Sequence, residues 1–168
     1  MTAAAPGLAI DPLLDLFGGS LRQVTKAVAE IPDERLAEQH GAIVNHPAWT
    51  LSHLGAAAGG ICNIMDEPAG AASPDEFARV GPGSLPSPER ARYGPKADLL
   101  ARLTERHALA ASAVRARHAD YFPRPTPENN RHLAPTVGQL VTFLLAAHES
   151  YHLGQLMQWR RAAGFISK

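Results

Sequence analysis

The sequence predicts an all-α protein, a four-helix bundle whose helices are joined by long connections rich in proline and glycine. Apolar residues recur at helical spacing along four separate stretches, and no stretch shows the alternation that marks a half-buried strand. The segments between these stretches carry most of the 14 prolines. Apolar residues make up 45% of the 168-residue chain, enough to fill one core, so we expect residues 1–168 to form a single domain.

Prolines bound the first two predicted helices. Asp11 is expected to cap the first helix, with Pro12 at its first helical position. This helix should end before Pro32, because proline disfavours the helical conformation in the residue that precedes it. The second helix is expected to begin at Pro47 and to stop before Pro68.

Apolar periodicity and capping residues mark the last two helices. Residues 96–119 form the predicted third helix. Thr136 is expected to cap the fourth helix, whose apolar residues follow the 3.6-residue period closely. Gly164 stands where a glycine commonly ends a helix.

Two irregular stretches connect these helices. Residues 67–95 are expected to form the long crossover of the bundle, with one helical turn at residues 74–79. A loop of this length inside a compact domain is often functional, so we expect the crossover to shape the pocket. Residues 120–135 form the second irregular stretch.

The charge balance argues against nucleic-acid binding. The chain has 16 basic and 16 acidic residues and therefore no formal net charge, whereas a duplex-binding domain usually shows a basic excess or a basic stripe. The densest basic stretch, residues 102–117, is interrupted by Glu105 and by alanines, which is typical of a solvated helix face.

Cysteine usage and the absence of long apolar runs suggest a cytoplasmic protein without membrane association. The one cysteine, Cys62, cannot form an internal disulfide and is expected to be a small buried hydrophobic residue. Residues 1–10 have neither the basic region nor the long apolar region of a signal peptide. No stretch approaches the ~20 continuous apolar residues of a membrane-spanning helix.

His148 and His152 enclose the most informative pattern of the chain, His-Glu-Ser-Tyr-His. Two histidines four positions apart lie about one turn apart on the same face of a helix, so their side chains can bind one metal ion together. Leu144, Tyr151 and Leu156 mark the face that is expected to point into the bundle. We therefore expect both histidines to point inward.

The same pattern matches the His-Glu-x-x-His motif of zinc proteases, but its context differs. The proteases need a glutamate aimed at the metal-bound water and a third ligand further along the chain. Only 16 residues follow His152, and none of them is His, Cys, Asp or Glu. A protease is therefore disfavoured. Glu149 lies about 100° around the helix from His148, and we expect it to be a solvated surface carboxylate.

A third ligand must come from another helix, and His53 is the best candidate. It lies in mid-helix among small and apolar residues, where a histidine is either a core residue with a hydrogen-bond partner or a ligand. An inward histidine pair on another helix favours the ligand. His46 is expected at the mouth of the site, whereas His107 and His118 are expected to be solvated.

These segments resemble the DinB-like superfamily, the DinB/YfiT-like metalloenzymes. The matching residues are Asn-His-Pro-Ala-Trp-Thr-Leu-Ser-His-Leu at 45–54, Val-Gly-Pro-Gly-Ser at 80–84, Tyr-Gly-Pro-Lys-Ala-Asp-Leu-Leu at 93–100 and Thr-Val-Gly-Gln-Leu at 136–140. The most specific match is His-Glu-Ser-Tyr-His-Leu-Gly-Gln at residues 148–155. The resemblance extends from about residue 11 to residue 165.

The resemblance implies an up-down-down-up bundle and a metal site formed by His53, His148 and His152. It also implies one divalent ion, zinc or nickel, and a homodimer. Characterised relatives include metal-dependent S-transferases and isomerases that use low-molecular-weight thiols such as bacillithiol, mycothiol or glutathione. His46 departs from the family pattern, which has a small or apolar residue there, and this bears on the polarity of the pocket mouth.

Three neutral imidazoles leave a metal ion with one open position, as in catalytic rather than structural zinc sites. Such a site lowers the pKa of a bound water or thiol and so supplies a nucleophile at neutral pH. We expect a thiol-dependent S-transferase or isomerase that acts on a small electrophilic substrate. Two alternatives stay open: a hydrolase that uses metal-bound hydroxide, and a bundle that binds a metal or small molecule without catalysis. No catalytic residue is assigned, and Tyr151 and Gln155 are expected to border the pocket or support the ligands.

Overall fold

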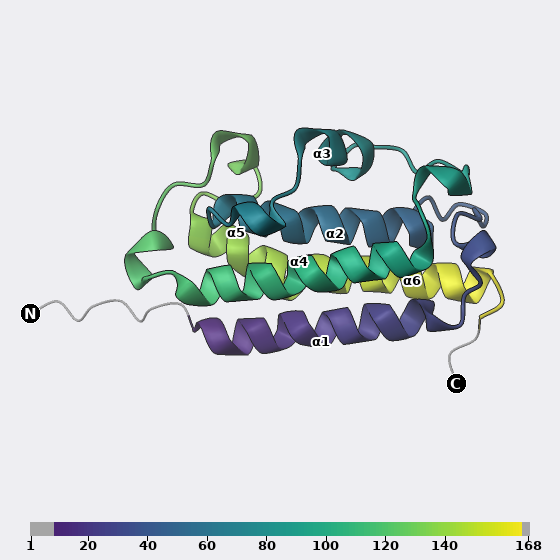
Figure 1. The fold of residues 1–168 in the computed structure, drawn as a ribbon, viewed down its shortest axis with the longest axis horizontal. Helices are drawn as coiled ribbons and strands as arrows, with labels where there is room; N and C mark the ends of the chain where they lie inside the picture. The colour runs from purple at the N-terminus through teal and green to yellow at the C-terminus, as the bar shows by residue number, and fades with distance from the viewer. Residues whose placement is uncertain (1–8, 166–168) are drawn as a thin grey trace, which may run out of the picture.

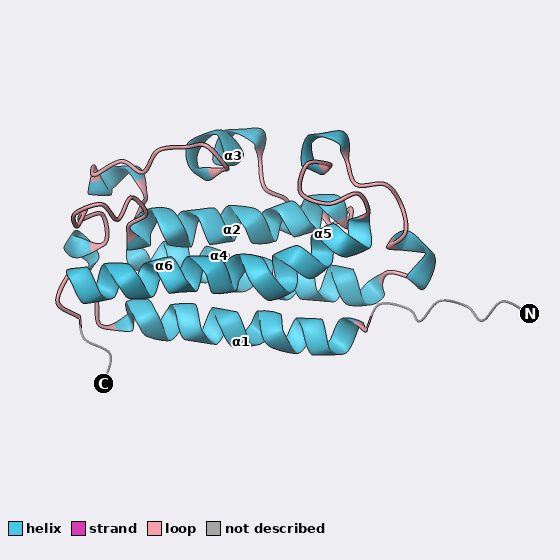
Figure 2. Ribbon diagram, turned by 180° about the vertical axis from the view of Figure 1, so that it is seen from behind, coloured by secondary structure: helices cyan, strands magenta, loops and turns pink. Residues whose placement is uncertain are grey.

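The computed structural model describes residues 9–165, and this part of the chain is helical and contains no strand. The all-α class predicted from the sequence is therefore confirmed. None of the described helices is long and apolar enough to cross a membrane. Four helical rods run side by side in Figures 1 and 2: α1 (Ile10–Ala29), α2 (Pro47–Ile64), α4 (Lys96–Ala116) and a last rod composed of α5 (Val137–Phe143), η6 (Leu144–His148) and α6 (Glu149–Ala162).

The directions of the four rods match those of the predicted bundle. In Figure 1, α1 and the last rod run one way, and α2 and α4 run the other. At the start of α4, Lys96 Nζ donates to the carbonyl oxygens of Ala29 (3.1 Å) and Ile31 (2.7 Å) at the end of α1. At the opposite end, Arg115 of α4 pairs with Asp11 of α1 at 3.3 Å. This arrangement is compatible with the up-down-down-up order.

The first helix begins earlier than the sequence suggested. The N-cap of α1 is Ala9, which makes no side-chain cap hydrogen bond. The prediction that Asp11 caps this helix is wrong, since Asp11 lies in the first turn, where its charge interacts favourably with the helix dipole. Ile10 packs against the core, and this contact extends the helix beyond the expected cap.

The predicted ends of the last rod are confirmed. The side chain of Thr136 accepts a hydrogen bond from the backbone N–H of Gln139 (3.4 Å). After α6, Gly164 adopts a φ of +84°, and the N–H of Phe165 donates to the carbonyl of Arg160 at 2.8 Å. These are the features of a Schellman cap, in which a left-handed glycine lets the chain satisfy the last free carbonyls.

The crossover from α2 to α4 contains short helices and passes over α2 (Figure 1). Its central helix is the turn predicted at residues 74–79. Ser73 caps this turn in a reciprocal capping box with Glu76. The short helices of the chain are η1 (Asp33–Arg35), η2 (Pro68–Gly70), α3 (Pro74–Val80), η3 (Arg90–Arg92), η4 (Ala119–Tyr121) and η5 (Glu128–Asn130).

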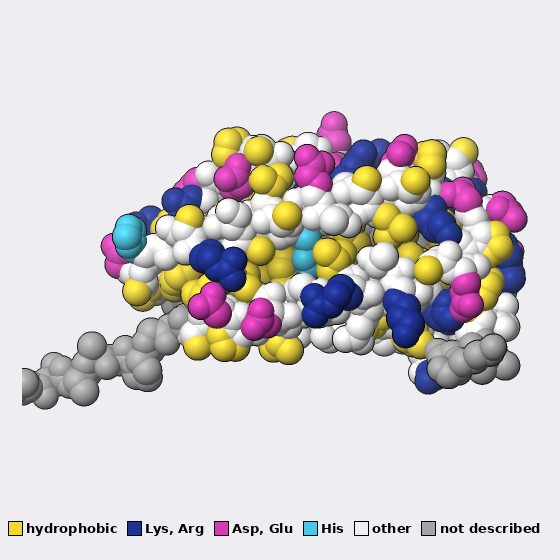
Figure 3. Space-filling model, turned by 60° about the horizontal axis from the view of Figure 1, so that its bottom comes forward, with side chains coloured by type: hydrophobic (Ala, Val, Ile, Leu, Met, Phe, Trp, Pro, Cys, Tyr) yellow, Lys and Arg dark blue, Asp and Glu magenta, His cyan; other side chains and the backbone are white. Residues whose placement is uncertain are grey.

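Two apolar clusters fill the bundle, one toward each end. The first includes Phe17 and Met65, and the second includes Leu54 and Trp159. Between them every rod contributes buried polar side chains at one level, which we call the polar layer: Ser20 of α1, His53 of α2, His107 of α4, and Glu149 and His152 of α6. Outside the bundle, basic and acidic side chains are interspersed around hydrophobic ones on the face in Figure 3.

The last rod contains a π-helical segment, η6, which the regular apolar periodicity of the sequence does not indicate. Along the last rod, four buried residues are spaced four positions apart: Val137, Val141, Leu145 and Glu149. In a regular α-helix each step of four turns the face by about 40°, so three steps would turn it by about 120°. The wider turn of η6 absorbs this drift and keeps Glu149 in the core.

The crossover approaches α2 closely at Gly59. A Cβ atom on Gly59 would lie 2.7 Å from Ala72 Cβ and 2.9 Å from Ala72 N, so the two backbones could not stay where they are. We expect Gly59→Ala to lower the free energy of unfolding by about 1 kcal/mol or more, because the cost of overpacking exceeds the gain in helix propensity. Urea denaturation measures this change.

Gly154 provides the matched control for Gly59→Ala. It also lies inside a helix, but a Cβ atom there would meet nothing within 4 Å. Gly154→Ala should therefore raise the free energy of unfolding by about 1 kcal/mol. Equal effects of the two substitutions would show that the approach of Ala72 does not constrain α2.

Candidate metal centre

Three histidines from two rods meet between the apolar clusters. His53 is on α2, His148 is the last residue of η6, and His152 is one turn further along α6. The Nε2 atoms of His53 and His148 lie 3.1 Å apart. One ligand atom from each of the three histidines can be chosen so that all lie within 4.8 Å of one another. The structure thus brings together the three residues singled out in the sequence.

Hydrogen bonds made by Nδ1 orient two of these rings, His53 and His152. Nδ1–H of His53 donates to the carbonyl oxygen of Val80 at 2.6 Å. Nδ1–H of His152 donates to Oε1 of Gln155 at 2.9 Å, and the same oxygen accepts a bond from Asn45 Nδ2 at 2.9 Å. A carbonyl can only accept, so in each ring Nδ1 carries the proton and Nε2 keeps its lone pair. Partners of this kind commonly fix the tautomer and orientation of metal-binding histidines.

Aromatic packing further restricts His53. The Trp49 ring stacks on it with centroids 4.7 Å apart and an angle of 6° between the planes. Trp49 is itself held by a hydrogen bond from Nε1–H to Ser84 Oγ at 3.2 Å. The crossover therefore supports His53 twice, through Val80 and through Ser84.

Burial keeps the three imidazoles neutral. Loss of hydration, together with the proximity of the His53 and His152 rings, lowers the pKa of His148 to about 3. The pKa of His152 falls to about 4 for the same reasons, burial first and then the proximity of His53. Burial also lowers the pKa of His53. At neutral pH all three rings therefore offer lone pairs, which is the form that binds metal ions.

The sequence predicted that Tyr151 points into the bundle, and this prediction is wrong. Its side chain is 65% exposed and touches the site only at the edge, with its ring centroid 5.2 Å from that of His152. The inward face of α6 is rotated toward Glu149, so residue 151 falls on the outer side. The expectation that Gln155 supports a ligand agrees with its contact to His152.

The prediction that Glu149 is a solvated carboxylate is also wrong. It is 3% exposed, and its Oε1 lies 2.5 Å from Nε2 of His107 on α4. Its Oε2 accepts a hydrogen bond from Ser20 of α1. An angle of about 100° from His148 leads into the bundle rather than to solvent, because α6 lies against α1 and α2, and Glu149 reaches across the interior to His107 of α4.

His107 and His46 also lie elsewhere than expected. His107 is buried, not solvated, and the Phe17 ring stacks on it with centroids 3.5 Å apart. His46 is fully buried rather than at the mouth of the site. It caps α2, accepting from the backbone N–H of Trp49 (3.2 Å) while its Nε2–H donates to the carbonyl of Ser87 (2.8 Å). Pro47 at the first helical position was the signal that could have revealed this cap.

Several supporting residues could not be linked to their partners from the sequence. Asn45, Val80 and Ser20 are far from their partners along the chain, and no spacing rule connects them. His118 lies on the surface as predicted, although α4 ends two residues before it, at Ala116. Cys62 is buried, also as predicted, and burial raises the pKa of its thiol.

The helical fold and the histidine group together define a helical protein with a candidate metal centre. The family model of the DinB superfamily matches residues 17–156, and the chain belongs to that superfamily. The resemblance predicted from the sequence is thereby confirmed. No curated protein and no solved structure gives a significant match.

The pair of His107 and Glu149 predicts a non-additive effect on stability. His107→Leu removes the donor and leaves a buried carboxylate without its partner, so we expect a loss of about 3–5 kcal/mol in the free energy of unfolding. Replacing both residues, as His107→Leu with Glu149→Leu, should recover much of this loss, because an apolar pair carries no buried charge. Ser20 keeps an acceptor in the Phe17 carbonyl at 2.8 Å. Urea denaturation of the double-mutant cycle tests this, and additive losses would contradict it.

The lowered pKa values predict how the stability of the metal-free protein depends on pH. In the unfolded chain, His148 and His152 become protonated as the pH falls below the ordinary histidine pKa of 6.5. In the folded protein they become protonated only near their lowered pKa values of about 3 and about 4. The unfolded state is then favoured, so stability should fall as the pH drops from about 6.5. Chemical denaturation between about pH 7 and pH 5 measures the slope. A variant with His148→Ala and His152→Ala should show a shallower slope, and an equal slope would contradict the assignment.

Proposed function

We propose that this protein is a metal-dependent enzyme that transfers a low-molecular-weight thiol to a small electrophilic substrate, or isomerises such a substrate with the thiol's help. His53, His148 and His152 would hold one divalent ion, zinc or nickel. The observation that carries the proposal is the group of three neutral imidazoles, two of which, His53 and His152, are oriented by hydrogen bonds. When bound, the ion would supply Lewis acidity that lowers the pKa of a thiol at its open position.

The donor set fits a reactive rather than a structural ion. Among the described residues the group has three members, and no further His, Cys, Asp or Glu belongs to it. Structural zinc sites are usually closed by four protein ligands, whereas catalytic sites use three. The 3.1 Å between the Nε2 atoms of His53 and His148 is close to the roughly 3.3 Å that two tetrahedral ligands at ~2.05 Å would show.

The state of Glu149 favours thiol chemistry over hydrolysis. A hydrolase needs a general base near the attacking water. Glu149 is next to His148 in sequence, but it points about 100° away around the helix, where His107 and Ser20 hold both of its oxygens. A thiol needs less help, because its own pKa is far lower than that of water and its sulfur attacks as thiolate. The thiol loses its proton, sulfur bonds to carbon, and the leaving group departs with the electron pair.

Metal content is the first test of this proposal. We expect purified, tag-free protein to carry about one equivalent of zinc or nickel and the variant with His148→Ala and His152→Ala to carry none. His118→Ala with His132→Ala is the matched control, since both residues are exposed and lie outside the group. Elemental analysis gives the result. A wild type without metal, even after incubation with zinc or nickel, would overturn the proposal.

Thiol-dependent turnover is the second test. Metal-loaded protein should accelerate the reaction of a chromogenic aryl halide with glutathione, mycothiol or bacillithiol, and the double histidine variant should not. If the protein binds metal yet none of the thiols accelerates the reaction, the non-catalytic metal-binding alternative replaces the transferase. If the halide is consumed equally fast without thiol, hydrolysis replaces it.

A further inference from the structure

A cavity of about 480 Å³ lies between α2, α4 and the crossover, apart from the histidine group. Its inner wall is apolar and includes Leu51 and Leu99, both buried, together with Gly55. Most of the other lining residues belong to the crossover, between residues 76 and 94. The volume is within the ordinary range for small-molecule sites, about 300–1,000 Å³. The crossover thus lines a cavity, but one that does not include the three histidines, whereas the sequence led us to expect it at the pocket of the metal site.

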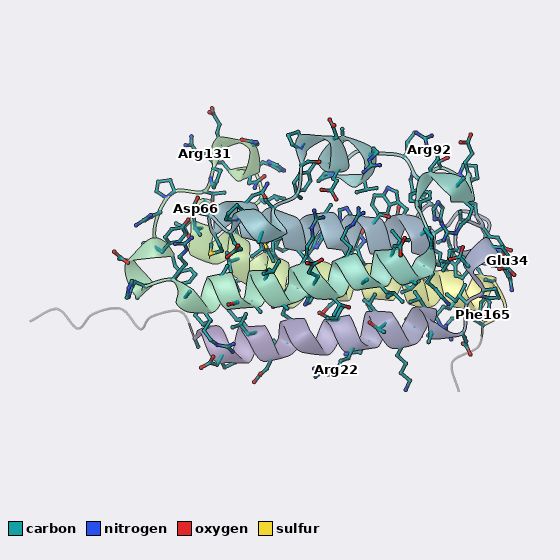
Figure 4. All side chains as sticks on the ribbon, in the orientation of Figure 1. Arg22, Glu34, Asp66, Arg92, Arg131 and Phe165 are labelled. Carbon is teal, nitrogen blue, oxygen red and sulfur yellow. The ribbon has the colours of Figure 1, made fainter. Side chains whose placement is uncertain are left out.

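The lining is strongly biased toward positive charge. Arg79, Arg92 and Arg102 line the cavity, and Glu76 is the acidic residue among the lining side chains. Figure 4 shows Arg92 on the crossover, above the ends of the bundle helices where α2 and α4 begin. Arginine guanidinium groups are planar forks that match carboxylate and phosphate oxygens.

Glu76 does not neutralise the charge of these three arginines, because a fourth arginine, Arg106, already binds its carboxylate. Arg106 binds both of its oxygens at 2.9 Å, and the two side chains are only 12% and 15% exposed. These hydrogen bonds lower the pKa of Glu76 to about 2. Arg102 reaches the same carboxylate only at 3.4 Å and is 55% exposed.

The local charge contrasts with the chain as a whole. Arg79, Arg92 and Arg102 line the cavity together with Glu76, and Arg106 pairs with this carboxylate from outside the lining. Counting all five residues gives a local excess of three positive charges in a chain with no formal net charge. Within the described residues neither Arg79 nor Arg92 forms an ion pair. Nearby Arg90, by contrast, pairs with Asp33 at 2.8 Å.

We propose that this cavity binds a small organic anion with at least two negative charges, held by Arg79, Arg92 and Arg102 and resting on the apolar wall. The site is separate from the histidine group but shares a wall with it. Val80 and Ser84 line the cavity, and the same residues hold His53 and Trp49. The anion is thus bound next to the residues that support the candidate metal centre.

Calorimetric titration with citrate and with pyrophosphate, at constant ionic strength, tests this proposal. The titrations use the wild type and the variant with His148→Ala and His152→Ala, in which no metal ion at the histidines can bind the anion. Saturable binding in both proteins is the expected result. Because the variant lacks the histidine site, the outcome does not depend on the proposed function. A preference for citrate or for pyrophosphate identifies the group as carboxylate or phosphate.

Two kinds of variant separate the cavity from general charge. Arg79→Ala with Arg92→Ala should weaken binding by at least about tenfold, because each removes a charged donor. Arg115→Ala with Arg161→Ala removes the same charge outside the cavity lining and should leave binding unchanged. Gly55→Leu keeps every charge but fills the cavity, where an added Cβ meets nothing within 4 Å, and should abolish binding.

The proposal is overturned by any of three results. The first is the absence of saturable binding tighter than about 1 mM for both anions. The second is an equal loss of affinity in the two double arginine variants, which would indicate bulk electrostatics. The third is full binding by Gly55→Leu once circular dichroism and urea denaturation have shown that it is folded.

Discussion

The contact between Glu149, His107 and Ser20 holds three of the four rods at one level, and the rest of the bundle is arranged around it. A carboxylate that is 3% exposed is costly to bury unless its oxygens are bound. Here α4 and α1 each supply a donor to it. A shift of α6 along its axis, or a rotation about it, would break both bonds. The contact therefore defines the position of α6 relative to its neighbours. Apolar packing alone specifies this position less precisely, because it is not directional.

The candidate metal centre follows from that position. His148 and Glu149 are adjacent in the chain and point in different directions, His148 toward His53 of α2 and Glu149 toward α1 and α4. The π-turn ends at His148, so it sets the rotation of both side chains together. When Glu149 is bound in the polar layer, His148 and His152 face His53. The same layer separates two apolar clusters. Its Glu149 is bound by Ser20 and His107 of the layer, whereas His53 and His152 bind Val80 and Gln155 outside it.

The crossover has a structural role at two neighbouring sites. Its Val80 carbonyl and Ser84 hydroxyl support His53 and Trp49. Its arginines face outward into the cavity beside them. The close approach of Ala72 to Gly59 fixes the segment to α2. A segment that looks irregular in sequence is thus bound at several points, which explains how a long connection can contribute to defined sites.

The sequence by itself determined the helices and the histidine pair. Prolines, the Thr136 cap and apolar periodicity act locally, so they can be read without knowing the fold, and two histidines four residues apart must share a helix face. The tertiary structure decided which polar side chains are buried. Glu149 and His107 are of residue types that are usually exposed, but they are buried here, whereas Tyr151 is a large aromatic residue that is exposed. Their places depend on the rotation of α6, which a π-turn and contacts from distant helices fix. No local pattern encodes that rotation, because its energy comes from partners more than 40 residues away in the chain.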